Sequence, residues 1–457
     1  MERKNAWAAY AGDDGRVEAF AKAYCDFINN GKTERECVAY GEKLAKAHGF
    51  EDLNAVIRSG RKLEAGARVY VNWMGKSFML FVLGAKPLEE GMNILGAHID
   101  SPRIDVKQNP LYEDGDLAYL DTHYYGGIKK YQWVAMPLAL HGVIIKKNGE
   151  KVPVNIGEDE NDPVFCISDL LIHLAQEQMA KNAKDVVEGE ALDLIVGGRP
   201  LAGEEKDAVK ANVLKLLDDK YGVEEEDFLS AELEIVPAGK ARDMGFDRSM
   251  ILGYGHDDRV CAYPSMMAVL DYEGTPDYTL CCIITDKEEI GSVGATGMAS
   301  HYLENTVAEL YACTADYCEL AVRRCLRNSR MLSSDVSAGY DPNFASAFEK
   351  KNSAFLGRGI CFNKFTGSRG KSGSNDANPE FMASLRKIMD DAGVAFQTAE
   401  LGRVDLGGGG TIAYLCAKYG MNVIDSGIAV LSMHAPYEII SKVDLYEGYR
   451  CYCAFLK

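Results

Sequence analysis

Polar side chains that can bind a metal ion follow apolar runs at several places in this sequence. They are His98 and Asp100 after "NILGA", Asp257 in "GYGHDDRV", Glu288 and Glu289 after "CCIITDK", Asp335 after "RMLSS", and His434 in "VLSMHAPYE". Imidazole together with carboxylate suits Zn²⁺, Mn²⁺ or Co²⁺. Two histidines and three or more carboxylates exceed what one ion needs, so the set predicts two metal ions that share a carboxylate. Such a pair activates a water molecule and polarises the carbonyl group that this water attacks.

Two pairs of nearby residues in this set indicate a division of roles. Asp100 is poorly placed to bind the same ion as His98, and it suits a partner that orients the His98 ring. Successive side chains at a strand end point in different directions, so either Glu288 or Glu289 can bind metal while the other transfers protons as a general base. Each of these residues alone is typical of a structural polar group, but the whole set favours a metal site.

An α/β domain is predicted to position these side chains. Residues 16–48 have the pattern of two helices, and buried strands are indicated by "FMLFVLGAK", "MNILGAHID", "YTLCCIITD", "RMLSSDV" and "MNVIDSG". Amphipathic helices are expected over 299–325 and 378–393, and a last helix begins at Ser441 with a capping pattern. This alternation predicts a mixed, mostly parallel sheet flanked by helices. Ligands bind outside the carboxyl ends of the strands in such sheets, which is where the polar residues stand.

The segment 106–246 differs in character from its surroundings. Alternating, aromatic-containing stretches such as "LAYLDTHYYGG" and "YQWVAMPLALHGVIIKK" come before acidic loops such as "GEDENDP" and "GVEEEDF". The chain is also too long for one ordinary core. We therefore expect an α/β domain made of residues 1–105 and 247–457, into which residues 106–246 are inserted as a strand-rich module.

The composition excludes several classes of partner. The chain has 457 residues, 47% of them hydrophobic and 26% charged, which is typical of a globular protein. Its net charge of −18 would repel nucleic acid. No apolar run approaches the roughly 20 residues that cross a bilayer, so no membrane partner is expected. The N-terminus carries no export signal, and the cytoplasm is the expected location.

The cysteines favour the same location. There are 13 of them, an odd number, and no C-x-x-C pair is present. Residues such as Cys281, Cys282, Cys313 and Cys416 lie in apolar contexts, where cysteine acts as a small core residue. This usage is typical of a protein in a reducing compartment.

Four motifs together resemble one peptidase family. "GAHIDSPRID", "DKEEIGSVGATG", "SSDVSAGYDPN" and "LSMHAPYE" follow one another in this order. In order and spacing they resemble the M18 family of aspartyl aminopeptidases over nearly the whole chain, insertion included. The resemblance implies a zinc-aminopeptidase-like α/β fold and a peptidase with two metal ions that removes N-terminal residues, often acidic ones, from peptides.

The resemblance also implies a role for each site residue. His98 and Asp335 would bind one metal, Glu289 and His434 would bind the other, and Asp257 would bridge the two. Its neighbour Asp258 competes for the bridging role, and Asp257 is preferred because the family's bridging aspartate is commonly followed by Asn, a slot that Asp258 fills here. Glu288 would be the general base, and Asp100 would support His98. The two divalent ions are expected to be Zn²⁺, with Mn²⁺ or Co²⁺ as alternatives.

The inserted segment resembles the family's dimerisation domain. The resemblance implies homodimers formed through this domain, which assemble further into a tetrahedral dodecamer. A histidine of this domain would reach the active site of a neighbouring subunit. His173, in "ISDLLIHLAQEQ", is the nearest candidate, although its apolar periodic context is equally typical of a core histidine.

Two loops are candidates for substrate binding. "FNKFTGSRGKSGSND" supplies Lys364, Arg369 and Lys371 and resembles a stretch of one family branch. A cation there would attract an acidic side chain of the substrate, whereas a plain solvated basic loop is the alternative. In "DLGGGGTIAY", glycines including Gly408 and Gly409 would let the backbone approach the substrate, because the loop lacks the Lys-Ser/Thr ending of a phosphate-binding loop.

Two other functions remain open from the sequence. An enzyme with the same two metals could remove the acyl group from an N-acyl amino acid. A protein of this fold could also serve only as an assembly or cargo-binding protein, but the retained ligands and Glu288 argue against that.

Overall fold

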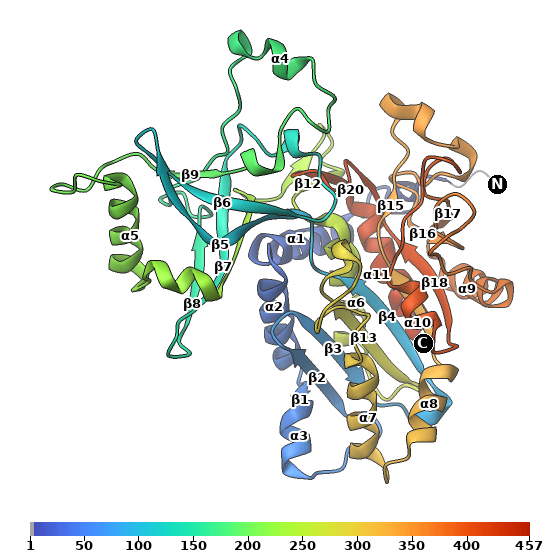
Figure 1. The fold of residues 1–457 in the computed structure, drawn as a ribbon. Coiled ribbons are helices and arrows are strands. Elements are labelled where there is room, and N and C mark those ends of the chain that lie inside the picture. The colour runs from blue at the N-terminus through green and yellow to red at the C-terminus, as the bar shows by residue number, and fades with distance from the viewer. Residues whose placement is uncertain (1–3) are drawn as a thin grey trace. The chain divides into compact units, whose positions relative to one another are not determined.

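A computed structural model describes residues 4–457, which form two compact units (Figure 1). The first unit contains residues 4–100, 241–433 and 438–457. The second contains residues 101–240 together with the short stretch 434–437. The chain thus leaves the first unit after Asp100 and returns to it at Ala241.

A mixed nine-stranded sheet forms the centre of the first unit. Its strands in spatial order are β1 (Glu51–Asp52), β2 (Arg68–Trp73), β3 (Ser77–Val82), β13 (Thr279–Thr285), β4 (Met92–His98), β14 (Arg330–Ser334), β18 (Asn422–Gly427), β16 (Ile360–Asn363) and β17 (Phe396–Thr398). The central strands β13, β4, β14 and β18 run parallel to one another. This confirms the predicted α/β class and the mixed sheet.

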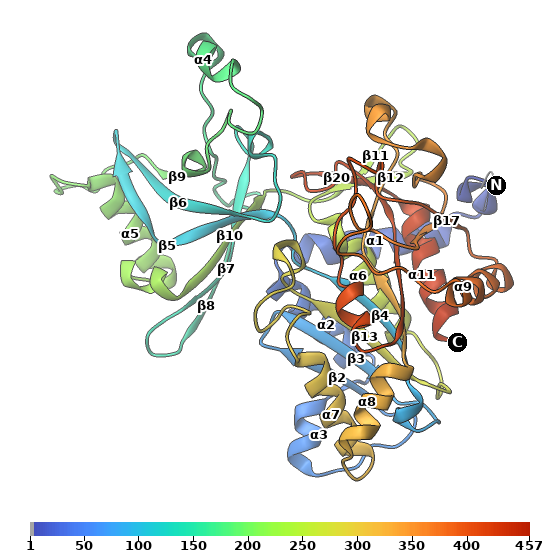
Figure 2. The same ribbon diagram turned by 45° about the vertical axis from the view of Figure 1, so that its right-hand side comes forward.

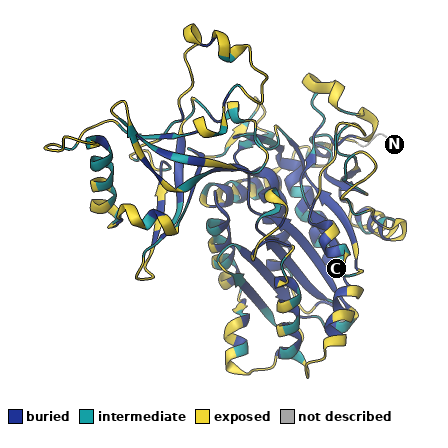
Figure 3. Cartoon of the chain, in the orientation of Figure 1, coloured by how far each residue is buried: buried dark blue, intermediate teal, exposed yellow. Residues whose placement is uncertain are grey.

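Helices cover both faces of this sheet. On one face pack α1 (Gly15–Asn30), α2 (Glu34–Ala47), α6 (His256–Leu270), α9 (Pro379–Ala392) and α11 (Lys442–Leu456). On the other pack α3 (Leu53–Ser59), α7 (Tyr302–Thr314), α8 (Glu319–Asn328) and α10 (Ala413–Ala417). The strand residues divide between the two cores by alternation, so that Phe78 and Leu80 of β3 lie in one and Met79 and Phe81 in the other. Both faces of the central strands are covered, and every residue of β4 and β13 is buried (Figure 3).

A smaller five-stranded sheet also belongs to the first unit. It contains, in spatial order, β11 (Arg242–Met244), β12 (Met250–Gly253), β20 (Glu438–Ser441), β19 (Ala429–Leu431) and β15 (Ser337–Ala338). Its strand β12 leads directly into α6, and β15 follows shortly after β14. This sheet therefore holds the segments that continue from the ends of the central strands.

The second unit is built on an antiparallel six-stranded sheet. Its strands in spatial order are β8 (Lys151–Ile156), β7 (Leu138–Ile145), β10 (Ala231–Pro237), β5 (Arg103–Asp114), β6 (Leu117–Tyr125) and β9 (Leu194–Gly197). Helix α5 (Ala208–Tyr221) contacts β5, β6 and β9. The short α4 (Gln176–Met179) lies on a long loop that extends away from this sheet (Figure 2).

Most predicted elements are present, with three differences. The helix expected over 299–325 is two helices, α7 and α8, because residues 315–318 interrupt it. The strand expected from "YQWVAMPLALHGVIIKK" begins only at Leu138, since Pro137 has no N–H to donate to a ladder. Ser441 does precede the last helix, but its side chain makes no capping hydrogen bond.

Two further sequence expectations concern the cysteines and membrane-spanning helices. The cysteines named above, Cys281, Cys282, Cys313 and Cys416, are all buried in the core as predicted. None of the helices within residues 4–457 combines the length and apolar character that a membrane crossing requires.

Candidate functional site

Strand pairing brings the predicted site residues of the first unit to one level of the sheet. In the parallel pair β13 and β4, Thr285 is opposite His98. In the parallel pair β14 and β4, Ser333 is opposite Gly96, so that Asp335, two residues further, reaches the level of His98. The carboxyl ends of three neighbouring strands therefore present their polar residues together, as the alternation of strands and helices predicted.

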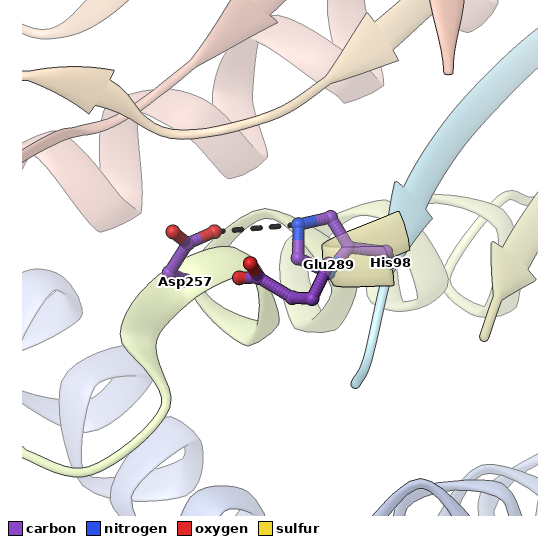
Figure 4. Close-up of side chains that lie close together, drawn as sticks. All are labelled: His98, Asp257 and Glu289. Carbon is purple, nitrogen blue, oxygen red and sulfur yellow. Dashed lines mark ion pairs between the residues drawn. The ribbon is translucent and has the colours of Figure 1, made fainter. Parts of the chain in front are cut away.

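His98 lies at the centre of this group. Its Nε2 atom is 3.3 Å from Oδ1 of Asp257, 3.9 Å from Oε2 of Glu288 and 3.9 Å from Oδ1 of Asp335. Figure 4 shows the side chains of His98, Asp257 and Glu289 turned toward one another. His98 and Asp257 are almost entirely buried. Their donor atoms thus converge on one small, largely dry volume.

Two overlapping groups in this volume have the geometry of metal sites. Ligand atoms of His98, Asp257 and Glu289 all lie within 4.8 Å of one another, and so do those of His98, Glu288 and Asp335. One imidazole and four carboxylates are the donors that zinc and related divalent ions bind. The residues therefore fit such ions by type and by proximity.

The charges of this group also favour a bound cation. Burial, and then repulsion by Glu288, raises the pKa of Asp335 well above its ordinary value. Burial would lower the pKa of His98, but hydrogen bonds with Asp100 and Asp257 outweigh it and raise that pKa. Buried carboxylates this close together need positive charge, which a divalent cation would supply.

Asp100 connects the end of β4 to the Glu288–Glu289 pair. The backbone N–H of Glu288 donates to Oδ1 of Asp100, and that of Glu289 donates to Oδ2, each over 3.1 Å. Nδ1 of His98 donates to the carbonyl oxygen of Asp100 over 3.0 Å, which leaves Nε2 directed at the carboxylates. Asp100 is completely buried. Asp100 thus fixes the ring of His98 through its backbone carbonyl and the turn that carries both glutamates through its side chain.

Replacing Asp100 by asparagine is expected to lower metal affinity or kcat by about 10- to 100-fold. The amide has one acceptor atom, so one of the two N–H groups would face an NH₂ donor instead of an oxygen. Metal content and kcat/KM of the purified variant check this. The exposed Asp390→Asn change on α9 is the matched control, and wild-type values for Asp100→Asn would contradict the role given to this carboxylate.

The start of α6 separates the two aspartates that competed for the bridging role. The peptide bond between Asp257 and Asp258 is cis, and both residues depart from helical backbone angles. The Asp257 side chain enters the His98 group, whereas Oδ2 of Asp258 accepts the backbone N–H of His98 over 3.3 Å. Burial raises the pKa of Asp258 to about 8. The arrangement favours Asp257 as the ligand and Asp258 as a support for β4.

Two supporting residues escaped the sequence reasoning. Arg259 is completely buried, and its guanidinium donates to the carbonyl oxygens of Ile99 and Lys32 over 3.0 and 2.9 Å. Glu438 accepts the backbone N–H of Asp257 over 3.0 Å. In the sequence, Arg259 and Glu438 are recognisable only as charged residues beside apolar ones, in "HDDRVCAY" and "YEII". Such a residue indicates a buried partner but does not identify it.

A second buried carboxylate lies near Glu288. Oδ1 of Asp425, on β18, accepts a hydrogen bond of 2.5 Å from the hydroxyl of Thr411. Burial, with Glu288 among the further causes, raises the pKa of Asp425 to about 7. On the same strand, a Cβ atom on Gly427 would overlap the carbonyl oxygen of Asp335. β18 therefore requires glycine here to hold Asp335 in place.

The remaining predicted residues are not members of the two groups around His98. His434 groups with the second unit, where its Nδ1 donates to the carbonyl oxygen of Gly127 over 2.8 Å. The sequence analysis expected His434 in the α/β domain made of residues 1–105 and 247–457. The structure instead assigns residues 434–437, which precede β20, to the second unit. His173 is also in the second unit, exposed on the loop that precedes α4, and therefore is not a core histidine.

The two predicted substrate loops contact each other in the first unit. Lys364 forms an ion pair with Asp376, which Lys371 also approaches to 3.2 Å. A Cβ atom on Gly408 would lie 2.5 Å from the Cα of Ser368, and the N–H of Gly409 donates to Thr366 over 3.0 Å. The glycines thus permit close packing of loop on loop, a contact that the sequence reasoning did not anticipate.

Comparison with known proteins places this chain in a family. The model of the "Aminopeptidase I zinc metalloprotease (M18)" family matches residues 27–456. A protein of Clostridium acetobutylicum named "Probable M18 family aminopeptidase 1" is 58% identical, over 100% of this chain and 98% of its own length.

Solved structures agree with this match. Aminopeptidase I from Clostridium acetobutylicum superposes with a TM-score of 0.93 at 56% identity, and an M18 aminopeptidase from Thermotoga maritima with 0.95 at 43%. Each comparison covers 100% of this chain and 99% of the other. The family model, the sequence identity and the shared fold all cover the strand ends that carry the His98 group. The chain belongs to the M18 family of zinc metallo-aminopeptidases.

Proposed function

We propose that this aminopeptidase removes N-terminal residues, acidic ones preferentially, through two divalent metal ions, with Glu288 as the general base. The observation that carries the proposal is the convergence of Asp257, Glu288, Glu289 and Asp335 on the His98 side chain. His98, Asp257, Glu289 and Asp335 would hold the metals, and family resemblance adds His434. Zn²⁺ is the expected ion, with Mn²⁺ and Co²⁺ as alternatives.

Bound divalent ions would lower the pKa of the attacking water and polarise the scissile carbonyl. Glu288 takes a proton from that water and passes it to the leaving amine. Asp100 positions Glu288 by accepting its backbone N–H. Asp425 lies near Glu288, and burial raises the pKa of Asp425 to about 7.

The acidic preference is supported by the charge of the Lys364 loop. The single carboxylate of Asp376 pairs with both Lys364 and Lys371, so this group keeps a net positive charge. An acidic side chain of the substrate would be attracted to it. This positive charge would select among N-terminal residues and would take no part in the reaction itself.

The test is release of N-terminal residues by the purified protein with Zn²⁺, Mn²⁺ or Co²⁺ supplied in turn. Substrates carrying Asp, Glu, Leu, Ala and Lys report the preference, and an N-acetylated peptide reports dependence on a free amine. Release of Asp and Glu alone supports the full proposal. Cleavage of the acetylated peptide would indicate a deacylase, and no turnover of any substrate would indicate an assembly or cargo-binding protein.

Replacing Lys364 by methionine is expected to lower kcat/KM for substrates with N-terminal Asp or Glu by about tenfold, the effect of losing one charged partner. Substrates with N-terminal Leu should be cleaved as before. The ratio of the two kcat/KM values is the measurement. The exposed Lys387→Met change on α9 is the matched control, and an unchanged ratio would remove Lys364 from substrate binding.

We also propose that the chain forms homo-oligomers through the second unit, as dimers that build a tetrahedral dodecamer in the family arrangement. The support is a cluster of exposed apolar side chains around His173, namely Leu170, Leu171, Ile172, Leu174 and Met179. A cluster of this kind is typical of a surface that another protein covers. A second copy of the chain is the proposed partner.

Ile172→Asp is expected to reduce the oligomer to smaller species, because a charge would be buried in the contact. His173→Ala should keep the oligomer and lower kcat/KM by about tenfold, if His173 enters a neighbouring active site as proposed. Light scattering after size-exclusion chromatography, together with the peptide assay, measures both. An unchanged mass for Ile172→Asp would show that this loop is outside the contact.

A further inference from the structure

The two glutamates of the His98 group stand on a loop whose ends lie together. This loop, residues 287–296, follows β13, and Glu288 and Glu289 are its second and third residues. The chain then returns to the sheet, because Asp286 and Gly297 form a parallel backbone bridge. The position of both carboxylates therefore depends on the contacts that hold the two ends of the loop together.

The side chain of Asp286 joins these two ends. It is completely buried. Its Oδ1 atom accepts the backbone N–H of Lys287, at the start of the loop, over 2.8 Å. Its Oδ2 atom accepts the hydroxyl of Thr296, at the end of the loop, over 2.6 Å. One carboxylate thus binds both ends of the loop by hydrogen bonds.

Thr296 is in turn anchored to the central sheet. It is buried, and its carbonyl oxygen accepts the hydroxyl of Ser77, the first residue of β3, over 2.6 Å. The hydroxyl of Thr285, the last residue of β13, donates to the same oxygen over 3.4 Å. The end of the loop is therefore fixed by two strands, and the Asp286 carboxylate connects this fixed end to the turn that carries Glu288.

The backbone within the loop requires such support. Lys287 and Ser292 have φ angles of 70° and 59°, which are unfavourable for residues that carry a Cβ atom. The N–H of Ser292 donates to the carbonyl oxygen of Lys287 over 2.7 Å, and a Cβ atom on Gly297 would lie 2.2 Å from the carbonyl oxygen of Ser292. A conformation of this kind persists only where the surrounding structure holds it.

Two buried carboxylates hold the turn at successive residues. Asp100 accepts the backbone N–H groups of Glu288 and Glu289, and Asp286 accepts that of Lys287, which directly precedes them. Asp286 also binds the far end of the loop at Thr296. It therefore determines where the turn lies relative to the end of β13, and with it the place of the Glu288 carboxylate.

We propose that Asp286 and Thr296 are positioning residues for the general base, and that their hydrogen bond holds Glu288 where it takes a proton from the attacking water. The inference rests on the proposed role of Glu288 and adds the residues that set its position. Both act through the backbone of the loop and not by contact with the substrate. A displacement of about 1 Å can cost about 100-fold in rate, so one hydrogen bond at the loop end is able to control turnover.

Thr296→Val is the variant that isolates this hydrogen bond. Valine has nearly the shape of threonine but lacks the hydroxyl, so Oδ2 of Asp286 loses that donor. We expect kcat to fall by about 10- to 100-fold, whereas KM and metal content stay within about twofold of the wild-type values. The measurements are kcat and KM for the preferred peptide and the metal content of the purified variant. An unchanged kcat would overturn the proposal.

Two further variants separate positioning from a general loss of stability. Thr296→Ser removes a buried methyl group but keeps the hydroxyl, so its kcat should stay within about threefold of the wild type. Thr122→Val, in β6 of the second unit, removes another buried hydroxyl, which donates to the carbonyl oxygen of Leu192 over 2.7 Å. It should lower the melting temperature and leave kcat unchanged. Equal losses of kcat in Thr296→Val and Thr296→Ser would overturn the proposal.

A double-mutant cycle tests whether the effect depends on Glu288. In a Glu288→Gln protein no carboxylate remains to be positioned, so adding Thr296→Val should change kcat by less than about twofold. This result would support the proposal. Losses that multiply in the double variant would overturn it, because the hydrogen bond would then act on another part of the site.

Hydrogen exchange keeps this test separate from that of the proposed function. Loss of the Thr296 hydroxyl should speed the exchange of backbone amides over residues 287–297 in the folded protein, and Thr296→Ser should exchange as the wild type does. The measurement needs no substrate, so a failure of the proposed function would appear in the peptide assays alone. Equal exchange in Thr296→Val and the wild type would overturn the role of this hydrogen bond whatever the reaction.

Discussion

Replacing Glu288 by glutamine is expected to reduce kcat by about 10³-fold while the protein keeps its metal ions. Glutamine has the shape of glutamate but cannot take a proton from water, and general acid–base catalysis contributes about 10²- to 10⁴-fold. The backbone N–H of residue 288 would still donate to Asp100, so the turn should keep its place. The measurements are kcat for the preferred substrate and metal content of the purified variant.

Its neighbour provides the matched comparison. Glu289→Gln alters the carboxylate that lies with His98 and Asp257, and it should therefore lose metal as well as activity. Glu319→Gln on the exposed face of α8 should change neither. Activity of Glu288→Gln within tenfold of the wild type would exclude Glu288 as the general base. Loss of metal from Glu288→Gln with full retention by Glu289→Gln would exchange the two roles.

Removing the metal with a chelator is expected to abolish activity and lower the melting temperature by about 3 °C. A ligand present at about 100 times its Kd stabilises the folded state by ~2.7 kcal/mol. In addition, withdrawal removes positive charge from the buried group of Asp257, Glu289 and Asp335, whose carboxylates then repel one another more strongly. Calorimetry and the peptide assay, before and after re-addition of Zn²⁺, Mn²⁺ or Co²⁺, are the measurements.

The same treatment of a His98→Ala protein gives the control. Without the central imidazole the site should bind metal poorly, so the chelator should shift its melting temperature little. Full activity of the wild-type protein after exhaustive chelation would rule out a metal-dependent reaction. A melting shift of equal size in both proteins would place the stabilising ion elsewhere.

The sequence by itself determined which residues stand at the strand ends. Apolar strands such as "NILGA" and "CCIIT" are bounded by polar residues, and a buried strand can end in His98 or lead into Glu288 only where those side chains gain partners. Periodicity was sufficient for this because both faces of the sheet are buried. The parallel pairing of β13, β4 and β14 then aligned the residues as expected.

Tertiary structure decided which partners those residues meet. Asp100 and Glu288 are 188 positions apart in the sequence. Asp425 lies near Glu288, although the stretch "NVIDSG" does not indicate which residue its aspartate contacts. Hydrophobic patterns report the face that a residue occupies, but not the strand that becomes its neighbour.

The choice between Asp257 and Asp258 also depended on tertiary structure and not on the sequence pattern. Both follow "GYGH", and a pattern cannot tell which of two adjacent carboxylates turns toward His98. The backbone at the start of α6 directs Asp257 to the imidazole and Asp258 to the backbone of β4.

The contact between the two predicted substrate loops depended on the fold entirely. The two loops are separate in the sequence, and nothing in either of them indicates that the N–H of Gly409 donates to the carbonyl oxygen of Thr366. A residue type predicts what a side chain can bind, whereas the burial of Thr366 Oγ1 without a partner arises only once the loops pack. Composition and spacing therefore indicated the chemistry of this protein, and packing of distant segments decided its geometry.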